Sequence, residues 1–176
     1  MSRDVKLLIK KKYITTIIIV MLFNVFYVAS AYGGESKEEI KEDYTINIQS
    51  NSSENLILRL INEQRKMAGL LELKFDSRLM QLAKMKVQDM QEENYISHNS
   101  DKYGDIFNML KINNIEYTLA GENIARNANE SLAVKAWMNS QSHKKNILEK
   151  RYEYTGICVA KDKDYGYIYV QIFMEI

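Results

Sequence analysis

Proline is absent from this 176-residue sequence, and cysteine occurs only once, as Cys158. Without proline, the turns must rely on glycine, asparagine and aspartate. A single cysteine cannot form an internal disulfide, so a disulfide-stapled scaffold is excluded and the core must be held together by packing. Cys158 lies in an apolar run, and we interpret it as a small buried hydrophobic residue rather than a nucleophile.

Histidine is nearly as scarce, because the chain has only His98 and His143. Histidine is the side chain whose charge changes near neutral pH, and it is the commonest metal ligand. Any site built from two imidazoles must therefore contain both of these residues.

The first 31 residues differ in pattern from the rest of the chain. A basic head is followed by an apolar stretch from Tyr13 to Ala29, which closes on Ala29-Ser30-Ala31. This small-x-small ending predicts a signal peptide over residues 1–31 that is cleaved after Ala31. An uncleaved membrane anchor is the alternative, although two threonines and an asparagine interrupt the roughly 20 apolar residues that a span needs.

Residues 32–53 are rich in glycine, serine, glutamate, lysine and asparagine, which predicts a flexible linker and leaves residues 54–176 as the folded domain. Without the leader, the chain carries 19 basic and 22 acidic side chains, a net charge of −3. A mildly acidic chain lacks the basic surface of a nucleic-acid-binding protein, so we expect no nucleic-acid partner.

Apolar residues at helical spacing predict four helices in the domain. The helices are expected to begin near Ser53, at Asp76 or Ser77, near Asp105 and near Asn129, and Gly69 is expected to end the first. The residues expected to face the core are Ile57, Leu60, Ile61, Ala68, Leu79, Leu82, Ala83, Val87, Met90, Leu132, Ala133, Ala136 and Trp137.

Strand character dominates the end of the chain. An apolar run from Tyr154 to Ala160 precedes a turn at residues 162–166, and the following residues alternate between two largely apolar faces. Apolar residues on both faces suit a sheet that is covered on both sides. Helices first and an antiparallel β-hairpin last predict an α+β fold.

Three short segments contain both histidines: Tyr95-Ile-Ser-His98, Gly121-Glu-Asn-Ile-Ala125 and Trp137-Met-Asn-Ser140 running on to His143. With other short matches in order, they resemble the CAP superfamily of cysteine-rich secretory, antigen 5 and pathogenesis-related proteins, in its bacterial secreted, SCP-like form. The resemblance spans about Asn55 to Phe173. The other matches are Asn62-Glu-Gln-Arg65, Gly69-Leu70, Leu73, Phe75-Asp76, Leu79, Ala83, Asp89-Met90, Asn146-Ile-Leu148, Gly156 and Val170-Gln-Ile-Phe173.

The resemblance implies a three-layer α-β-α sandwich with a cleft that holds two histidines and two acids. By motif match the histidines are His98 and His143, and one acid is Glu122. Ser140 stands where the family usually has the second acid, and Ser142 stands where it usually has glycine. The four-residue site is therefore incomplete in this chain.

Two neutral imidazoles can bind zinc or another divalent metal, such as copper or nickel. Glu122 is then either a direct ligand or an acid that orients a histidine ring through a hydrogen bond. The alternative without metal is that His98 caps a loop and Glu122 holds it there, since neither histidine lies in a local metal-binding motif.

Three further residues belong to the expected cleft or its support. Asn123 is expected to satisfy backbone groups of a loop, and Trp137 to anchor the core. Ser140 lies three residues before His143, on the same helical face, but no acid completes a nucleophilic triad.

The sequence therefore favours a secreted or cell-envelope binding module over an enzyme, with an unidentified ligand of the cell wall, a lipid or a protein. Membrane attachment is expected only through an uncleaved leader. One alternative is a metal-assisted hydrolase of peptide or ester bonds with Glu122 as base. Another alternative is a lipid or sterol carrier, which needs an apolar groove.

Overall fold

The structure, a computed structural model, describes residues 52–176. The expected leader and most of the expected linker lie outside the described residues. The helices are α2 (Ser53–Met67), α3 (Ser77–Glu92), α4 (Ile106–Ile112), α5 (Glu130–Asn139) and α6 (Gln141–Ile147). The strands are β1 (Lys74–Phe75), β2 (Leu119–Asn127), β3 (Tyr154–Lys161) and β4 (Tyr167–Glu175). Among these helices, none is long and apolar enough to cross a membrane.

The strands form one mixed sheet in the order β1-β3-β4-β2. β1 is parallel to β3, whereas β3 pairs with β4 and β4 with β2 in antiparallel register. The expected C-terminal β-hairpin is therefore present as β3 and β4. β2 was not expected as a strand, and it forms one edge of the sheet.

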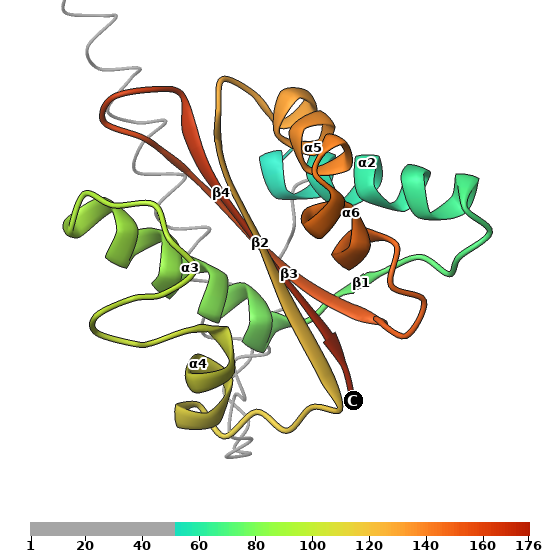
Figure 1. Cartoon of the computed structure of the whole chain (residues 1–176), viewed down its shortest axis with the longest axis horizontal. Helices are drawn as coiled ribbons and strands as arrows, with labels where there is room; N and C mark the ends of the chain where they lie inside the picture. Colours follow the sequence, from blue (N-terminus) through green and yellow to red (C-terminus); the bar gives the residue numbers. More distant parts are fainter. Residues whose placement is uncertain (1–51) are drawn as a thin grey trace, which may run out of the picture. The chain divides into compact units, whose positions relative to one another are not determined.

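Helices cover both faces of the sheet, with α3 and α4 on one side and α2, α5 and α6 on the other (Figure 1). The alternation of β4 divides its residues between the two cores. Ile168, Val170, Ile172 and Met174 pack with α3 and α4, whereas Tyr169 and Phe173 pack with α2, α5 and α6. This arrangement confirms the α+β class and the three-layer architecture.

The predicted helix starts are close to the observed ones. Asp76, Asp105 and Asn129 each cap a helix by accepting a hydrogen bond from a backbone N–H group two or three residues later. The first helix is capped by Ser52 rather than Ser53. Ser53 instead donates a hydrogen bond to Glu130 Oε1 at 2.5 Å, which links the starts of α2 and α5.

Three of the expected core positions are wrong. Leu132 and Ala136 are exposed, because α5 turns its Ala133, Val134 and Trp137 face inward. Ala68 is also exposed and ends α2 as its C-cap, whereas Arg65, one turn earlier, is fully buried.

The Arg65 guanidinium connects α2 to two loops. It donates to Leu71 O at 2.8 Å, Ile147 O at 2.8 Å, Glu149 O at 2.9 Å and Tyr152 O at 3.0 Å. Its charge is buried but saturated by backbone carbonyls, which is the condition under which an arginine is tolerated in a core. This residue therefore fixes the loop after α6 relative to the rest of the domain.

Gly156 allows α3 to lie directly on β3. A Cβ atom at this position would lie 2.1 Å from the backbone carbonyl carbon of Leu79. Only glycine permits this approach without displacing the helix. Because the site described below begins in the turn after α3, this contact helps to set the position of one of its walls.

Candidate functional site

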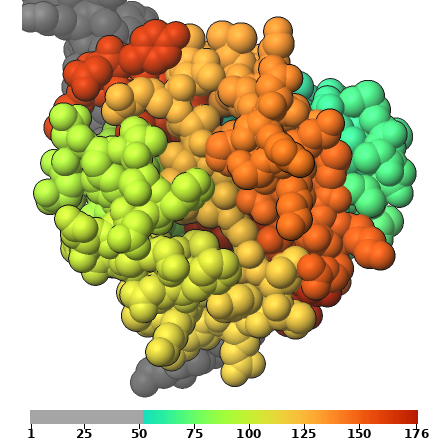
Figure 2. All heavy atoms as spheres, viewed as in Figure 1, coloured from blue at the N-terminus to red at the C-terminus, as the bar shows by residue number. Residues whose placement is uncertain are grey.

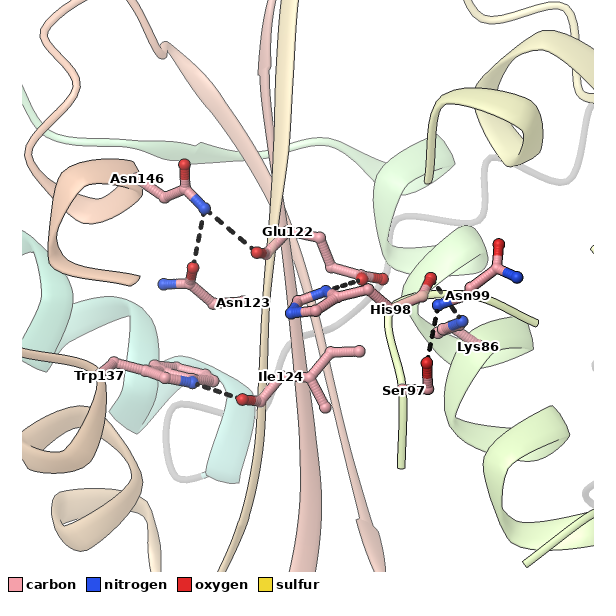
Figure 3. Close-up of polar contacts among 9 residues, drawn as sticks. All are labelled: Lys86, Ser97, His98, Asn99, Glu122, Asn123, Ile124, Trp137 and Asn146. Carbon is pink, nitrogen blue, oxygen red and sulfur yellow. Dashed lines mark hydrogen bonds and ion pairs between the residues drawn. The ribbon is translucent and has the colours of Figure 1, made fainter. Parts of the chain in front are cut away.

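The structure brings His98, Glu122 and His143 together at the free edge of β2. His98 lies in the turn after α3, Glu122 lies on β2 and His143 lies on α6. His98 Nδ1 is 2.6 Å from Glu122 Oε2 (Figure 3), and the ring centroids of the two histidines are 6.2 Å apart. The two rings therefore meet across the sheet edge, from opposite helical layers.

Figure 2 shows this region as a hollow between the segment around residues 80–105 and the segment around residues 135–150. β2 lies between the two walls. Because β2 is an edge strand, its outer side is not covered by a further strand. The hollow therefore exists because the two helical layers extend past the last strand.

Glu122 is the buried component of the site. Its side chain is only 2% exposed, whereas the side chain of His98 is 57% exposed. Within residues 52–176, the second carboxylate oxygen, Oε1, is buried without a hydrogen-bond partner. A buried carboxylate with one unused oxygen retains the capacity to accept a further donor.

His143 is partly buried and tends to remain neutral. Burial lowers the pKa of the His143 imidazole, and the neighbouring His98 lowers it further. Its backbone carbonyl accepts a hydrogen bond of 3.1 Å from Asn123 Nδ2. A neutral imidazole is the form that binds a metal or accepts a proton.

Asn123 is fully buried on β2 and lies at the centre of an amide network. Asn146 Nδ2 donates to Asn123 Oδ1 at 3.0 Å and to Glu122 O at 3.1 Å. Asn146, which sequence reasoning noted only as part of a motif, thereby attaches α6 to β2. These bonds fix the helix that carries His143 against the strand that carries Glu122.

Ser140 lies at the start of α6 as its N-cap residue. Its hydroxyl is 3.1 Å from the Ser142 hydroxyl, and no hydrogen bond between Ser140 and His143 is present in the described part of the chain. Nothing in this geometry activates Ser140 as a nucleophile, since activation requires a base within hydrogen-bond reach.

Trp137 lies behind the site in the α5 layer. It is 1% exposed and packs in the core that α2, α5 and α6 share. Its Nε1 donates a hydrogen bond of 3.1 Å to Ile124 O on β2 (Figure 3). Trp137 therefore satisfies a backbone carbonyl of β2 two residues after Glu122.

Lys86 on α3 is a residue that sequence reasoning missed. It is fully buried, and its Nζ donates to His98 O at 3.0 Å (Figure 3). The sequence does contain a signal for this residue. Lys86 lies between Ala83 and Met90 on the apolar face of α3, and a lysine on that face has to be buried with polar partners. Burial lowers the pKa of the Lys86 ammonium, whereas Glu122, Asp89 and Asp105 act in the opposite direction.

Two imidazoles and one carboxylate are the candidate metal ligands that this site offers. Within residues 52–176 there is no group of three or more histidine, cysteine, aspartate or glutamate side chains arranged to hold a metal. Glu122 instead contacts Nδ1 of His98, as acids behind a ligating histidine commonly do. Zinc sites with few protein ligands keep open positions for water or a bound molecule.

Comparisons with known proteins agree with this architecture. Residues 58–173 match the CAP family, described as the cysteine-rich secretory protein family. Two proteins of Bacillus subtilis are similar to the chain: the uncharacterized protein YkwD is 39% identical over 122 residues, and the uncharacterized membrane protein YlbC is 38% identical over 125 residues. The matches cover 69% and 70% of this chain but only 46% and 35% of these longer relatives.

Solved structures show the same fold. An extracellular protein containing an SCP domain from Bacillus anthracis superposes with a TM-score of 0.64 at 30% identity, over 70% of this chain and 40% of that one. An outer surface protein of Borrelia burgdorferi superposes with a TM-score of 0.65 at 25% identity, over 73% of this chain and 96% of that one. On the match over residues 58–173, the chain belongs to the CAP family of cysteine-rich secretory proteins.

Proposed function

We propose that this CAP domain is an extracellular or cell-envelope binding module in which His98 and His143 together hold a divalent metal ion. The observation that supports this proposal is the 2.6 Å contact between His98 Nδ1 and Glu122 Oε2 beside the ring of His143. When bound, the ion would supply a Lewis-acidic position at which an oxygen or nitrogen of a ligand binds.

The contact with Glu122 supports an orienting role for the acid. A carboxylate that accepts the Nδ1–H of His98 selects the tautomer whose Nε2 carries a free lone pair. The ring of His98 is largely exposed, so this second nitrogen is accessible from the hollow. The low pKa of His143 supports the same role, because this imidazole remains neutral down to a lower pH than usual.

Binding is favoured over catalysis for two reasons. The position of the second family acid is occupied by Ser140, whose hydroxyl contacts Ser142 rather than a histidine. Glu122 is buried and already engaged with His98, so it is poorly placed as a general base for an external water molecule. We therefore propose a ligand at the envelope, such as a cell-wall, lipid or protein component.

The relatives support a location outside the cytoplasmic membrane. Proteins with similar domains are described as extracellular, as outer surface or as membrane proteins. Cell fractionation with mass measurement of the exported species tests this location. A full-length chain in the cytoplasmic fraction would contradict it.

Titration calorimetry with zinc on the purified chain tests the metal site. His98→Ala and His143→Ala should each remove most of the zinc affinity, and the double variant should be little weaker than either single one, because both imidazoles bind the same ion. Glu122→Gln should weaken binding less, since an amide can still accept the Nδ1–H bond.

Lys145→Ala is the matched control, because Lys145 is exposed on the same helix as His143. It should leave the affinity unchanged. Unchanged zinc affinity in both histidine variants would contradict the proposal. Hydrolysis of peptide or ester substrates that a chelator abolishes would instead identify the domain as a metal-assisted hydrolase.

A further inference from the structure

Lys86 lies in the interior wall behind the candidate site. It belongs to α3, is fully buried and extends toward the turn that carries His98 (Figure 3). The core around it contains apolar side chains of α3, α4 and the sheet. Burial of a lysine is unfavourable unless its ammonium group is paired, so its presence at this position requires a specific partner.

The partner is the backbone of the His98 turn. Lys86 Nζ donates to His98 O at 3.0 Å, and it lies 5.6 Å from the centre of the Tyr95 ring. The Tyr95 hydroxyl in turn donates to Asp89 Oδ2, one turn further along α3. Both ends of the Tyr95-Ile-Ser-His98 segment are therefore attached to α3 through polar side chains.

The charge of Lys86 also complements the buried acid of the site. Glu122 is the largest electrostatic influence that favours the charged form of this lysine, ahead of Asp89 and Asp105. The Oε1 atom of Glu122 has no hydrogen-bond partner in the described region. Burial is the larger influence and lowers the pKa of the Lys86 ammonium, whereas the charge of Glu122 acts in the opposite direction.

We propose that Lys86 is the positioning residue of the His98–Glu122–His143 site, because its buried ammonium group holds His98 by the backbone carbonyl. The expected change in zinc affinity rests on the proposed metal-binding function. The expected loss of order in the His98 turn does not depend on that function. An apolar residue of the same length would fill the core equally well. It would leave His98 O without the ammonium donor.

The test compares Lys86→Met, Lys86→Arg and the control Lys84→Met in the purified chain. Lys84 is an exposed lysine two residues earlier on the same helix. Two properties are measured: the zinc dissociation constant and the amide hydrogen exchange of Asn99 and Ser100. These amides donate to Ser97 Oγ and Gly104 O within the turn. The amides of Asp164 and Tyr165, which bond Asp162 in a distant turn, are the internal reference.

Lys86→Met should weaken zinc binding and accelerate exchange in the turn by about tenfold each, the effect expected from the loss of one charged hydrogen bond. Exchange at the reference turn should not change. Lys86→Arg should restore protection of the turn, because it keeps both the charge and the donors, and Lys84→Met should resemble the wild type. A merely structural role would give equal effects at both turns and no rescue by arginine.

Zinc affinity and turn exchange that both stay at the wild-type level in Lys86→Met would overturn the proposal. Absence of zinc binding in the wild type would instead refute the proposed metal site. In that case, faster amide exchange in the His98 turn of Lys86→Met would still support the positioning role, and unchanged exchange would overturn it. If Lys86→Met does not fold, nitrogen-detected NMR of the wild-type lysine ammonium groups decides. Slow proton exchange at Lys86 relative to Lys84 supports the bond to His98 O, and equal rates overturn it.

Discussion

Asn146 on α6 donates hydrogen bonds to Asn123 Oδ1 at 3.0 Å and to Glu122 O at 3.1 Å, so one amide contacts two successive residues of β2. Asn123 then donates to His143 O at 3.1 Å, which returns the network to α6. The distance between His143 and Glu122 is consequently set by two amides, the buried Asn123 and the partly buried Asn146.

Asn146→Ala should lower the free energy of unfolding by about 1–3 kcal/mol, because it leaves the buried Asn123 Oδ1 and the Glu122 carbonyl without their donor. Urea unfolding followed by circular dichroism measures the loss. Lys145→Ala, an exposed neighbour on the same helix, is the control and should change stability by less than about 0.5 kcal/mol. Equal effects of both variants would mean that Asn146 does not attach α6 to β2.

Trp137→Ala should cost about 3–5 kcal/mol of stability, since the ring is fully buried in the α2, α5 and α6 core. Trp137→Phe should recover much of the packing but leave Ile124 O without its donor, with a loss of about 1–3 kcal/mol. Thermal unfolding by circular dichroism is the appropriate measurement, because both variants remove the only tryptophan. A loss below 1 kcal/mol in Trp137→Ala would be incompatible with this burial.

Arg65→Met should destabilise the domain by at least about 3 kcal/mol, because four backbone carbonyls lose a charged donor at once. Limited proteolysis should then cut first in the loop around residues 148–152, which this side chain holds. Arg59→Met on the exposed side of α2 is the matched control. Similar stability of the two variants would show that the carbonyls find water instead.

The imidazole of His143 should titrate below the ordinary histidine pKa in an NMR pH titration of the metal-free chain. Burial is the main cause and the charge of His98 the second. His98→Ala should therefore raise the pKa of His143 toward its ordinary value without restoring it fully. An unchanged value in this variant would mean that the two rings do not interact electrostatically.

The sign of the corresponding stability change follows from proton binding. The unfolded chain binds a proton at residue 143 more readily than the folded chain does, so stability increases with pH in this window. The stability contributed by a neutral His143 is present above the ordinary histidine pKa and decreases as the pH falls below it. His143→Gln should flatten the pH dependence of the urea midpoint in this range.

Much of the scaffold could be predicted from local patterns. The alternation of residues 167–174 predicted a strand with two apolar faces, and β4 is indeed buried on both. The spacing of Leu79, Leu82, Ala83, Val87 and Met90 identified the inner face of α3, because these residues recur with the period of a helix. Local capping chemistry similarly identified Asp76, Asp105 and Asn129 as helix starts.

β2 was missed because its sequence does not have strand character. Gly121, Glu122 and Asn123 have low strand propensity, yet they pair with Phe173, Ile172 and Gln171 of β4. The strand forms because β4 provides a complete partner and because Trp137 and Asn146 bond its outer carbonyls. Tertiary contacts here override the local preference.

The sequence by itself determined the family resemblance, the two apolar faces of the last strand and the three residues proposed for the site, since these depend on residue type and order along the chain. Only the tertiary structure decided how the site is held. Lys86 donates to the backbone of His98, and Asn146 donates to Glu122 and Asn123. Arg65 donates to the backbone of the loop after α6. A polar side chain in a core is stabilised by partners distant in sequence. No local pattern specifies those partners until the chain has folded.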